Sequence, residues 1–598
     1  MKDFKDNTRE RSDKEVLRRL VGYMKPYWKE FIVISLLLLV SLAIQLLPPF
    51  LIGRTVDTVS DPILSRDEKI EYMIILSIFF IIALAIGNFV QYIQNIMLQK
   101  VGQKTVVTLR NEVFNHIENL SIGQINQVPV GKLVTRVTND TNTISDMYTN
   151  VAINLVKNLL YLFAVLIVLL IISIKITLYL MLVIPVLLFA TYLFRKFSRA
   201  SYRRVRANVS EVNAFLSENL SGMKVTQIFN QETKKRREFK GHSLKLRNSY
   251  LQEILVFGIY RPIVYALSMV GAVIALYLGY QEVMAGILTA GILFTYYTYV
   301  GDFFEPVQQL AEQFNTLQNA FASAEKVFDV LDTKPDIIDQ EDAIELEKFS
   351  GAIEFKDVWF SYLPDEWVLR GVSFKVNPGD TVAFVGATGS GKTTILGLIV
   401  RNYEIQKGQI LIDGIDIHQI KRSSLRKHIG QMLQDVFLFS GTIEENITLR
   451  DDSITKDEVI HASEYVGANT FIDKLPEGYN HVVLERGNNF SSGQRQLISF
   501  ARALVYKPSL MILDEATANI DSETEELIQE SLEKMMNIST MLIVAHRLST
   551  IQHADKIIVM QKGEIKESGS HQELLRQKGL YYNLYQLQYD EKEATTEI

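Results

Sequence analysis

Six long apolar stretches in the first half of the chain restrict its fold more than any other feature. An α-helix needs about 20 mostly apolar residues to cross the hydrocarbon core of a bilayer. The stretches of roughly this length are Phe31–Leu51, Met73–Val90, Leu155–Ile174, Ile176–Phe194, Ile254–Tyr280 and Met284–Val300. One such stretch alone could be a buried helix of a soluble core, but six in succession predict a membrane domain with six spanning helices.

Lysine and arginine residues gather on one side of these stretches. They are frequent over residues 195–247 and absent from Gly279–Val283. Loops rich in basic residues stay on the cytoplasmic side of a membrane, so we expect the long loops and both termini to be cytoplasmic. The long loops have helical patterns, which predicts two hairpins with tips near residues 131–144 and 218–232. Residues 14–29 mix apolar and basic side chains and predict a helix that lies in the membrane interface.

Length and composition restrict the class of protein further. The chain has 598 residues, too many for a single hydrophobic core. We expect domains at residues 1–330 and 351–590, joined by a polar linker at 331–350 and followed by a tail at 591–598. The net charge of -6 argues against nucleic acid as the main partner. The absence of cysteine excludes disulfides, thiolate metal sites and cysteine nucleophiles.

The second domain carries a glycine-rich loop between a short apolar strand, Thr381–Val385, and an apolar helix, Thr394–Val400. The glycines allow successive backbone N–H groups to point at phosphate oxygens, and the helix adds its positive N-terminal end. Lys392 is expected to reach the β- and γ-phosphates, and the Thr393 hydroxyl to hold Mg²⁺. The loop and the start of its helix are Gly386, Ala387, Thr388, Gly389, Ser390, Gly391, Lys392, Thr393 and Thr394. This pattern predicts that the chain binds a nucleoside triphosphate.

Two carboxylates end a buried strand downstream of this loop. The run Leu510–Leu513 is apolar and is followed by Asp514 and Glu515. An acid at the carboxyl end of such a strand lies where Mg²⁺ is held beside a phosphate loop. We expect Asp514 to hold the metal and Glu515 to orient and partly deprotonate an attacking water; the lesser alternative is that they cap the next helix. His546 follows another apolar strand, Thr540–Ala545, and is a candidate γ-phosphate contact, although a histidine at a strand end is more often structural.

Between these elements, Asn489–Leu497 reads N-F-S-S-G-Q-R-Q-L and precedes a helical pattern. Together with the glycine-rich loop and the two acids, this segment resembles the motif set of ATP-binding-cassette (ABC) exporter half-transporters, and the resemblance covers nearly the whole chain. It implies a six-span helical domain with long cytoplasmic hairpins, fused to an α/β P-loop cassette. It also implies ATP and Mg²⁺ as cofactors, a second half-transporter subunit as partner, and a place in the cytoplasmic membrane.

The resemblance assigns roles to further residues. Tyr362 matches the aromatic residue that stacks on adenine, Gln434 the glutamine that binds Mg²⁺ and senses the membrane domain, and Asp521 the loop that crosses to the partner cassette. Glu485–Gly487 matches the segment that touches the partner's cytoplasmic tip. The catalytic set implied is Glu515, His546 and Gln434. The signature segment, which caps the ATP held by the opposite cassette, is Phe490, Ser491, Ser492, Gly493 and Gln494.

The signature departs from the usual L-S-G-G-Q at Ser492, which replaces a glycine whose backbone approaches the γ-phosphate. A side chain there crowds that approach or needs backbone angles that serine disfavours. Because this chain's own Glu515 and His546 are intact, the departure favours a heterodimer. In it, the loop and acids of this chain build the hydrolysing site, and Ser492 completes a weaker one. Neutral drift in a homodimer is the alternative.

Aromatic and acidic residues gather around the end of the sixth apolar stretch. They are Tyr296, Tyr297, Tyr299, Asp302 and Glu305. Stacking and cation–π contacts suit bulky apolar or cationic molecules, so export of small drugs or lipids is the working hypothesis. Packing of these aromatic residues between helices is at least as good an explanation. A lipid flippase, a sensor that regulates a partner without transport, and an energised channel are the other functions left open.

Overall fold

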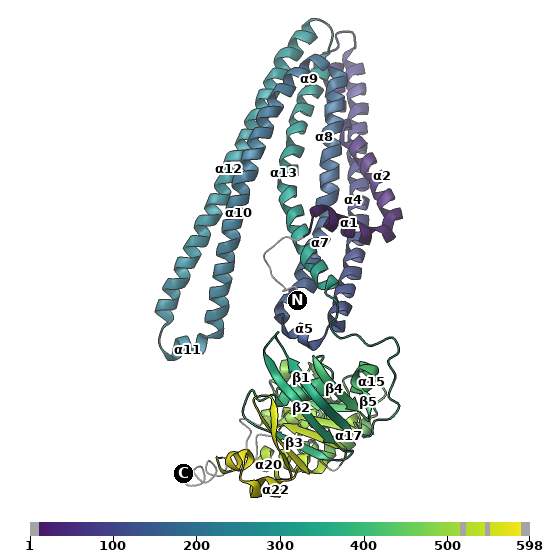
Figure 1. The fold of residues 1–598 in the computed structure, drawn as a ribbon. Helices are drawn as coiled ribbons and strands as arrows, with labels where there is room; N and C mark the ends of the chain where they lie inside the picture. Colours follow the sequence, from purple (N-terminus) through teal and green to yellow (C-terminus); the bar gives the residue numbers. More distant parts are fainter. Residues whose placement is uncertain (1–10, 515–521, 537, 545–550, 588–598) are drawn as a thin grey trace. The chain divides into compact units, whose positions relative to one another are not determined.

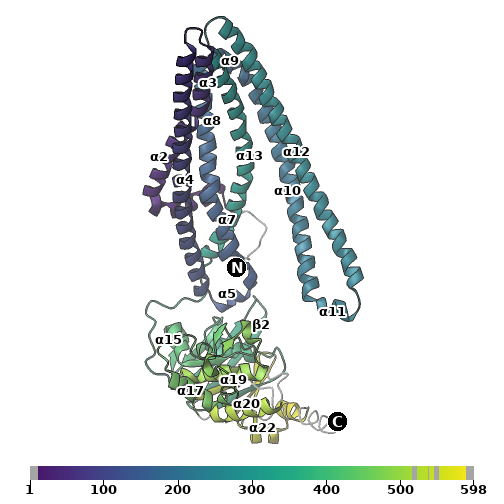
Figure 2. The same cartoon turned by 180° about the vertical axis from the view of Figure 1, so that it is seen from behind.

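The computed structural model describes residues 11–514, 522–536, 538–544 and 551–587. The chain divides into two compact units. The helical unit comprises Met1–Glu118 and Val128–Thr333, and the α/β unit comprises Asn119–Gln127 and Lys334–Ile598. Figures 1 and 2 show the elements of both units from opposite sides.

Long helices build the helical unit. They are α1 (Asp13–Met24), α2 (Trp28–Gln45), α3 (Leu47–Ser60), α4 (Arg66–Asn119), α6 (Val130–Thr135), α7 (Thr141–Asp146), α8 (Ala152–Ile172), α9 (Ile174–Leu180), α10 (Ile184–Ser221), α11 (Met223–Ile228), α12 (Glu232–Met284) and α13 (Ala290–Asp332), with π-helical turns at Arg136–Asp140 and Met147–Val151. Five helical segments of the described chain are long and apolar enough to cross a membrane: Asp13–Ser60, Arg66–Asn119, Val130–Ile172, Ile174–Ser221 and Glu232–Met284. Most of the sixth predicted stretch lies in α13.

Two predicted boundaries of these helices are wrong. The sequence predicts a stretch that starts at Met284, but this residue ends α12, residues 285–289 form a turn, and α13 starts at Ala290. Gly286 has a φ of +73° in that turn, an angle that glycine adopts readily and that cannot continue a right-handed helix. The third and fourth stretches separate at Ser173, whose backbone is extended, rather than at Lys175.

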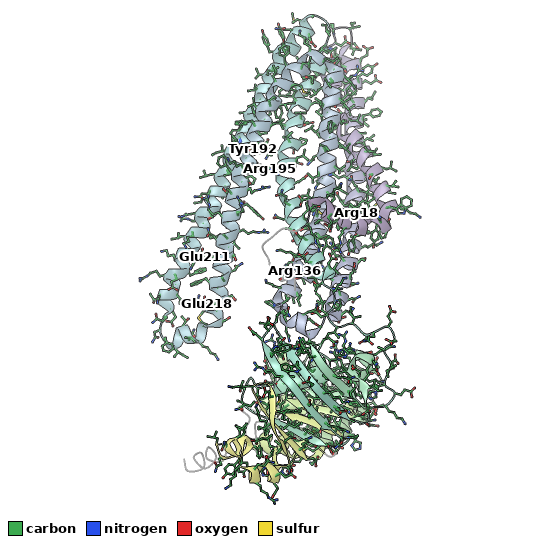
Figure 3. The ribbon with its side chains drawn as sticks, in the orientation of Figure 1. Arg18, Arg136, Tyr192, Arg195, Glu211 and Glu218 are labelled. Carbon is green, nitrogen blue, oxygen red and sulfur yellow. The ribbon has the colours of Figure 1, made fainter. Side chains whose placement is uncertain are left out.

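Two of the reversals between the long helices are formed by short helices. α11 joins α10 to α12, and Figure 3 places Glu211 and Glu218 on the charged part of α10 that leads to it, beyond Tyr192 and Arg195. The other reversal is α5 (Ile122–Asn126), which clusters with the α/β unit. The sequence places the first tip near residues 131–144, but these residues form α6, a π-helical turn and α7, so the reversal lies earlier in the chain.

Apolar side chains cover much of the outside of the helical unit and also fill its interior. Ile81 on α4 and Ile171 on α8 are 65% and 78% exposed. Apolar exposure on this scale fits contact with lipid rather than water. Inside, Val165, Leu169 and Ile176 are completely buried in one cluster shared by α8, α9, α12 and α13. The helices therefore pack on one another and leave an apolar outer surface.

The α/β unit contains a six-stranded sheet of order β12-β11-β3-β10-β9-β6 and a four-stranded antiparallel sheet of order β2-β1-β4-β5. The strands are β1 (Ile353–Ser361), β2 (Trp367–Val376), β3 (Thr381–Val385), β4 (Lys407–Ile412), β5 (Ile415–Asp416), β6 (Ile429–Met432), β7 (Gly441–Thr442), β8 (Val482–Val483), β9 (Leu510–Asp514), β10 (Thr540–Val544), β11 (Lys556–Gln561) and β12 (Glu564–Gly569). In the six-stranded sheet only β12 runs antiparallel to its neighbour. The carboxyl ends of its parallel strands therefore meet at one edge.

Helices cover this sheet on both faces. They are α14 (Lys392–Ile399), α15 (Arg422–Lys427), α16 (Ile443–Thr448), α17 (Lys456–Tyr465), α18 (Asn469–Ile472), α19 (Ser492–Val505), α20 (Ser522–Met535) and α22 (His571–Gln577). Along β3, Val382 and Phe384 join one hydrophobic cluster, whereas Ala383 and Val385 join the other. A strand that is buried on both faces is an almost continuous apolar run, which is why the sequence reveals it.

Candidate nucleotide site

The glycine-rich loop connects the carboxyl end of β3 to the start of α14. Gly386 has a φ of +152°, and a Cβ atom placed on it would lie 2.2 Å from the carbonyl oxygen of Met560. Gly391 has a φ of +102° and occupies the N-cap position of α14. Because Gly391 has no side chain, no capping group covers the first N–H groups of α14, which suits the binding of an anion there.

Lys392 is buried within this loop. Its Nζ donates hydrogen bonds to the carbonyl oxygens of Gly386 and Ala387, at 2.7 Å and 3.1 Å. Burial lowers the pKa of Lys392, and the charge of Asp514 opposes that shift. The ammonium group is thus held at the centre of the loop, where phosphate oxygens would replace the backbone carbonyls as its partners.

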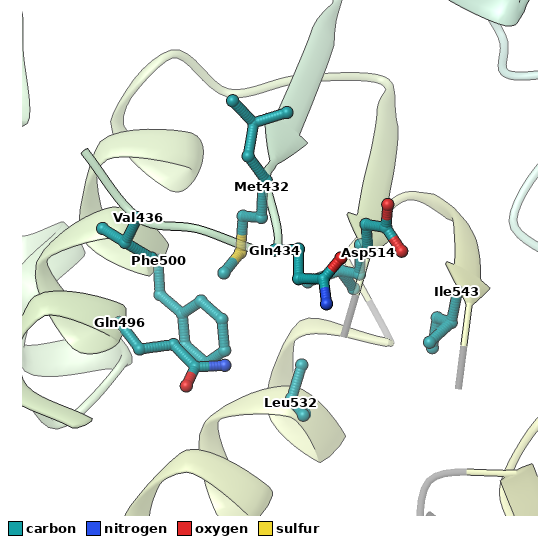
Figure 4. Close-up of a pocket in the computed structure, with 10 residues that line it drawn as sticks. Met432, Gln434, Val436, Gln496, Phe500, Asp514, Leu532 and Ile543 are labelled. Carbon is teal, nitrogen blue, oxygen red and sulfur yellow. The ribbon is translucent and has the colours of Figure 1, made fainter. Parts of the chain in front are cut away.

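Thr393 and Asp514 face each other across the sheet edge. The Thr393 hydroxyl, in the first turn of α14, donates to Asp514 Oδ1 at the end of β9, at 3.4 Å; β10 lies between β9 and β3, the strand that precedes the loop. Gln434 lies beside Asp514 (Figure 4). Hydroxyl, carboxylate and amide oxygens are the hard donors that Mg²⁺ prefers. These three side chains therefore fit a magnesium site. A small pocket beside Gln434 and Asp514 is lined by Met432, Leu433, Gln434, Val436, Gln496, Phe500, Leu513, Asp514, Leu532 and Ile543.

Tyr362 lies just after β1, close to the start of α14. Its hydroxyl is 3.0 Å from the Thr394 hydroxyl, and its side chain is 45% exposed. Its ring meets the rings of Phe360 and Tyr403 edge to face, with centroids 4.8 Å and 5.1 Å away. Partial burial raises the pKa of Tyr362. The ring therefore lies next to the phosphate loop and is partly open to a base; its role as an adenine contact stays a prediction.

The signature segment forms the N-terminus of α19. Ser491 is the N-cap: its hydroxyl accepts from the Gln494 N–H, and the Gln494 side chain accepts from the Ser491 N–H. Phe490 is buried against Phe471. Ser492 is the first helical residue and does not have a positive φ. The predicted backbone strain at Ser492 is therefore wrong, because the first turn of a helix suits serine. Only the bulk of its side chain remains as a cause of crowding.

Three predicted residues cannot be placed. Glu515, Asp521 and His546 lie outside the residues that the structure describes. Their roles as water-orienting base, partner-crossing residue and γ-phosphate contact stay predictions.

The predicted cargo residues on α13 differ in their surroundings. Tyr296 is fully buried, with its hydroxyl 2.9 Å from that of Thr177, and the Tyr299 hydroxyl donates to the carbonyl oxygen of Leu46. The Asp302 carboxylate accepts from the Tyr161 hydroxyl at 3.0 Å, and Glu305 accepts from the Gln309 amide at 3.1 Å. Tyr297 is half-buried. Tyr296 and Tyr299 thus take part in packing between helices, the alternative that the sequence left open.

Two residues near the nucleotide site were missed in the sequence. Tyr403 follows α14 and contacts Tyr362, and Gly123 of α5 contacts Tyr403. The only sequence signal for α5 is the capping-box pattern of Ser121 and Gln124. No periodicity marks so short a helix, and a single tyrosine in a loop carries no signal of its own.

Known proteins share both units of the chain. The family model described as ABC transporter transmembrane region matches residues 31–307, and the model described as ABC transporter matches residues 369–518. A probable multidrug resistance ABC transporter ATP-binding/permease protein of Bacillus subtilis, YheH, is 38% identical over 88% of this chain and 78% of its own length. An ATP-dependent lipid A-core flippase of Syntrophus aciditrophicus is 34% identical over 98% of this chain and 96% of its own length.

A solved structure has the same fold. The structure of a bacterial Atm1-family ABC exporter with ATP bound matches with a TM-score of 0.78 and 28% identity, over 96% of this chain and 99% of the other. The helical unit thus corresponds to a transmembrane domain and the α/β unit to a nucleotide-binding cassette. The chain belongs to the ABC transporters, as an ATP-hydrolysing half-transporter with its cassette fused behind its membrane domain.

Proposed function

We propose that the chain is half of a dimeric exporter that uses ATP to move hydrophobic or amphipathic small molecules, drugs or lipids, out of the cytoplasm. The observation that carries this proposal is α5, a reversal of the membrane-domain chain that clusters with the cassette. Through it, a change in the cassette is able to move the spanning helices α4 and α8. The multidrug and lipid A-core relatives support this class of cargo.

The residues of the nucleotide site divide the work on ATP. Lys392 exchanges its carbonyl partners for phosphate oxygens, and the N–H groups of α14 add their partial positive charge. Thr393, Asp514 and Gln434 are the proposed holders of Mg²⁺, which would neutralise phosphate charge when bound. Glu515 is the proposed base that orients water, and His546 the proposed γ-phosphate contact. This is catalysis by positioning and electrostatics.

A second chain is needed to complete the cycle. α19 presents the N-terminus of a helix that the resemblance assigns to the ATP of the opposite cassette. The other reversal, α11 with its C-cap Phe229, carries exposed apolar side chains: Val225 at 60%, Ile228 at 74% and Phe229 at 67%. Such a patch favours docking on another protein surface. Closing two cassettes around ATP would then drive alternating access of the membrane domains.

The identity of the second chain is the finer part of the proposal. Ser492 adds a side chain where ATP of the opposite cassette would approach α19, so we favour a heterodimer with one weaker site. A homodimer is the second candidate, and the capped and unstrained start of α19 favours it. The basic segment 195–247 supports a cytoplasmic cassette and cytoplasmic termini in the cell membrane.

Reconstitution in proteoliposomes tests this proposal. ATP-dependent movement of a fluorescent drug or a labelled lipid, lost in Lys392→Ala, is the expected result. Movement of lipid alone would identify a flippase. Cargo-stimulated ATP hydrolysis without movement would identify a regulator, and a steady current that exceeds ATP turnover would identify a channel. Either of the last two results would overturn export.

A further inference from the structure

Tyr403 is a point of contact between three parts of the cassette unit. It lies between α14 and β4, in the loop that follows the phosphate-loop helix. A Cβ atom placed on Gly123 of α5 would lie 2.9 Å from Tyr403 Cε1, and one placed on Gly397 of α14 would lie 3.6 Å from Cδ2. The ring is thus held between α5 and α14, with opposite edges turned to two glycines.

The third contact of Tyr403 is the nucleotide site itself. Its ring centroid is 5.1 Å from that of Tyr362, with the two planes at 86°, and 5.6 Å from that of Phe360. An edge-to-face pair of this kind fixes the plane of each ring. Because a stacked base must lie parallel to the ring of Tyr362, Tyr403 sets the orientation that adenine meets.

Polar contacts hold α5 against the same unit. The Gln124 side chain donates to the carbonyl oxygen of Lys334 at 2.9 Å and accepts from the N–H of Asp336 at 3.2 Å, and it also closes the capping box with Ser121. Gln124 is buried. A glycine within a helix costs about 1 kcal/mol relative to alanine. A glycine is nevertheless needed at position 123, because the methyl group of an alanine would clash with the edge of the Tyr403 ring.

We infer that Tyr403 couples occupancy of the adenine subsite to the seating of α5. The inference rests on the proposed ATP site and adds its regulation. Adenine that stacks on Tyr362 fixes the plane of the Tyr362 ring. The Tyr362 ring in turn fixes the Tyr403 ring, which then packs closely against Gly123. Displacement of α5 releases Tyr403 and disorders the stacking ring. Coupling of two sites is reciprocal, so a disturbed α5 weakens ATP binding and bound ATP holds α5 in place. Tyr403 is a positioning residue, because it is proposed to act through its contact with Tyr362.

The test uses the full chain in lipid nanodiscs and separates KM from kcat. Gly123→Ala pushes a methyl group into Tyr403 and is expected to raise KM for ATP about fivefold, with kcat changed less than about twofold. Gly131→Ala is the matched control, because a Cβ atom at Gly131 meets nothing within 4 Å. In Tyr403→Leu the ring is gone, so Gly123→Ala is expected to add no further rise in KM. Tyr403→Phe keeps the ring and retains the sensitivity to Gly123→Ala.

Hydrogen exchange of residues 119–127 gives a second, direct readout. ATP is expected to protect this segment in the native chain, whereas inorganic tripolyphosphate, which lacks the base, is not. Tyr403→Leu removes the protection by ATP. Equal effects of Gly123→Ala and Gly131→Ala, or equal protection by ATP and tripolyphosphate, would overturn the inference. If Lys392→Ala hydrolyses ATP normally, the proposed nucleotide site itself fails; if it is inactive while Gly123→Ala is silent, only the coupling fails.

Discussion

The two helical reversals of the membrane-domain chain, α5 and α11, are similarly short but have opposite surroundings. The side chains of α5 find partners within the same chain. Gln124 is buried and hydrogen-bonded to the backbone of residues 334–336, and Gly123 packs on Tyr403. α11 presents Ile228 and Phe229 with most of their surface exposed. The residues of α5 pack within the α/β unit, whereas Ile228 and Phe229 stay exposed among the residues that the structure describes.

This difference fits a chain that works as one subunit of a dimeric transporter. The contacts of α5 lie within the α/β unit, and the exposed apolar side chains of α11 are those that we expect a second cassette to cover. The α/β unit holds both the phosphate loop and the start of α19, which Ser491 and Gln494 cap. The predictions below test the two reversals in turn.

The largest effect is expected from a charge placed on α11. Phe229→Asp puts a carboxylate into a surface that we expect to be buried by the partner, and an unpaired buried charge costs several kcal/mol. Cargo movement in proteoliposomes should fall at least about tenfold, while binding of ATP to the isolated chain stays intact. Gln227→Asp, two residues earlier at an exposed polar position, is the control. Equal transport by both variants would remove α11 from the interface.

A smaller effect is expected when α5 loses its polar attachment. Gln124→Ala removes the side-chain contacts to Lys334 and Asp336, which together are worth about 1–3 kcal/mol when the remaining groups stay buried. Hydrogen exchange of residues 119–127 should accelerate, and cargo-stimulated ATP hydrolysis should fall severalfold. Gln127→Ala removes an exposed glutamine from the same segment and should change neither. Unchanged exchange in Gln124→Ala would show that α5 is held by other contacts.

Ser492→Gly tests whether the second subunit is a different chain or a second copy of this chain. The backbone at Ser492 is relaxed, so the change removes only a small side chain. In a heterodimer with a crowded second site, ATP hydrolysis should rise by about twofold at most, because the site built on Lys392 already carries the turnover. In a homodimer the same change acts on both sites. A loss of folding stability greater than about 1 kcal/mol, the helical cost of glycine, would contradict the relaxed geometry.

The smallest expected effect is the pH dependence of cassette stability, through His418 and Glu404, the residue next to Tyr403. The hydrogen bond that His418 donates to Glu404 raises the pKa of His418 above its ordinary value of 6.5 against the effect of burial, and Asp416 adds to the rise. Burial alone would raise the pKa of Glu404, but His418 and Arg401 outweigh it and lower that pKa below 4.5. The contribution of His418 to stability is complete below pH 6.5 and is lost as the pH rises through its folded-state pKa. That of Glu404 is present above 4.5 and is lost on acidification.

Thermal unfolding of the cassette between about pH 6 and about pH 8 measures this effect. The melting temperature of the native chain should fall more over this range than that of His418→Gln, by an amount equivalent to less than about 1 kcal/mol for so partly exposed a group. The exposed His553 provides the matched control, His553→Gln. Identical pH profiles of the native chain and His418→Gln would show that His418 is not ion-paired in solution.

The sequence predicted those features that depend on local composition. Apolar length revealed the spanning helices, and the apolar run of β3 with its following glycines revealed the phosphate loop. The prediction from sequence failed where apolar composition continued through a turn, as from Met284 to Leu288, because hydropathy does not distinguish a helix from a short apolar loop. Tyr296 and Tyr299 looked like cargo contacts because periodicity cannot say which neighbour covers a face. The contact of Gly123 with Tyr403 joins residues 280 positions apart, and no local pattern records it.

The most direct test of the central claim is photo-crosslinking from α11. The photoreactive amino acid p-benzoylphenylalanine replaces Phe229 in the full chain in native membranes, and the crosslinked peptides are identified by mass spectrometry. The expected product is a two-chain species in which Phe229 is joined to the cassette of a second half-transporter, either a differently tagged copy of this chain or a different subunit. Crosslinks from this position only to the chain's own cassette, or only to lipid, would contradict the division of roles between α5 and α11.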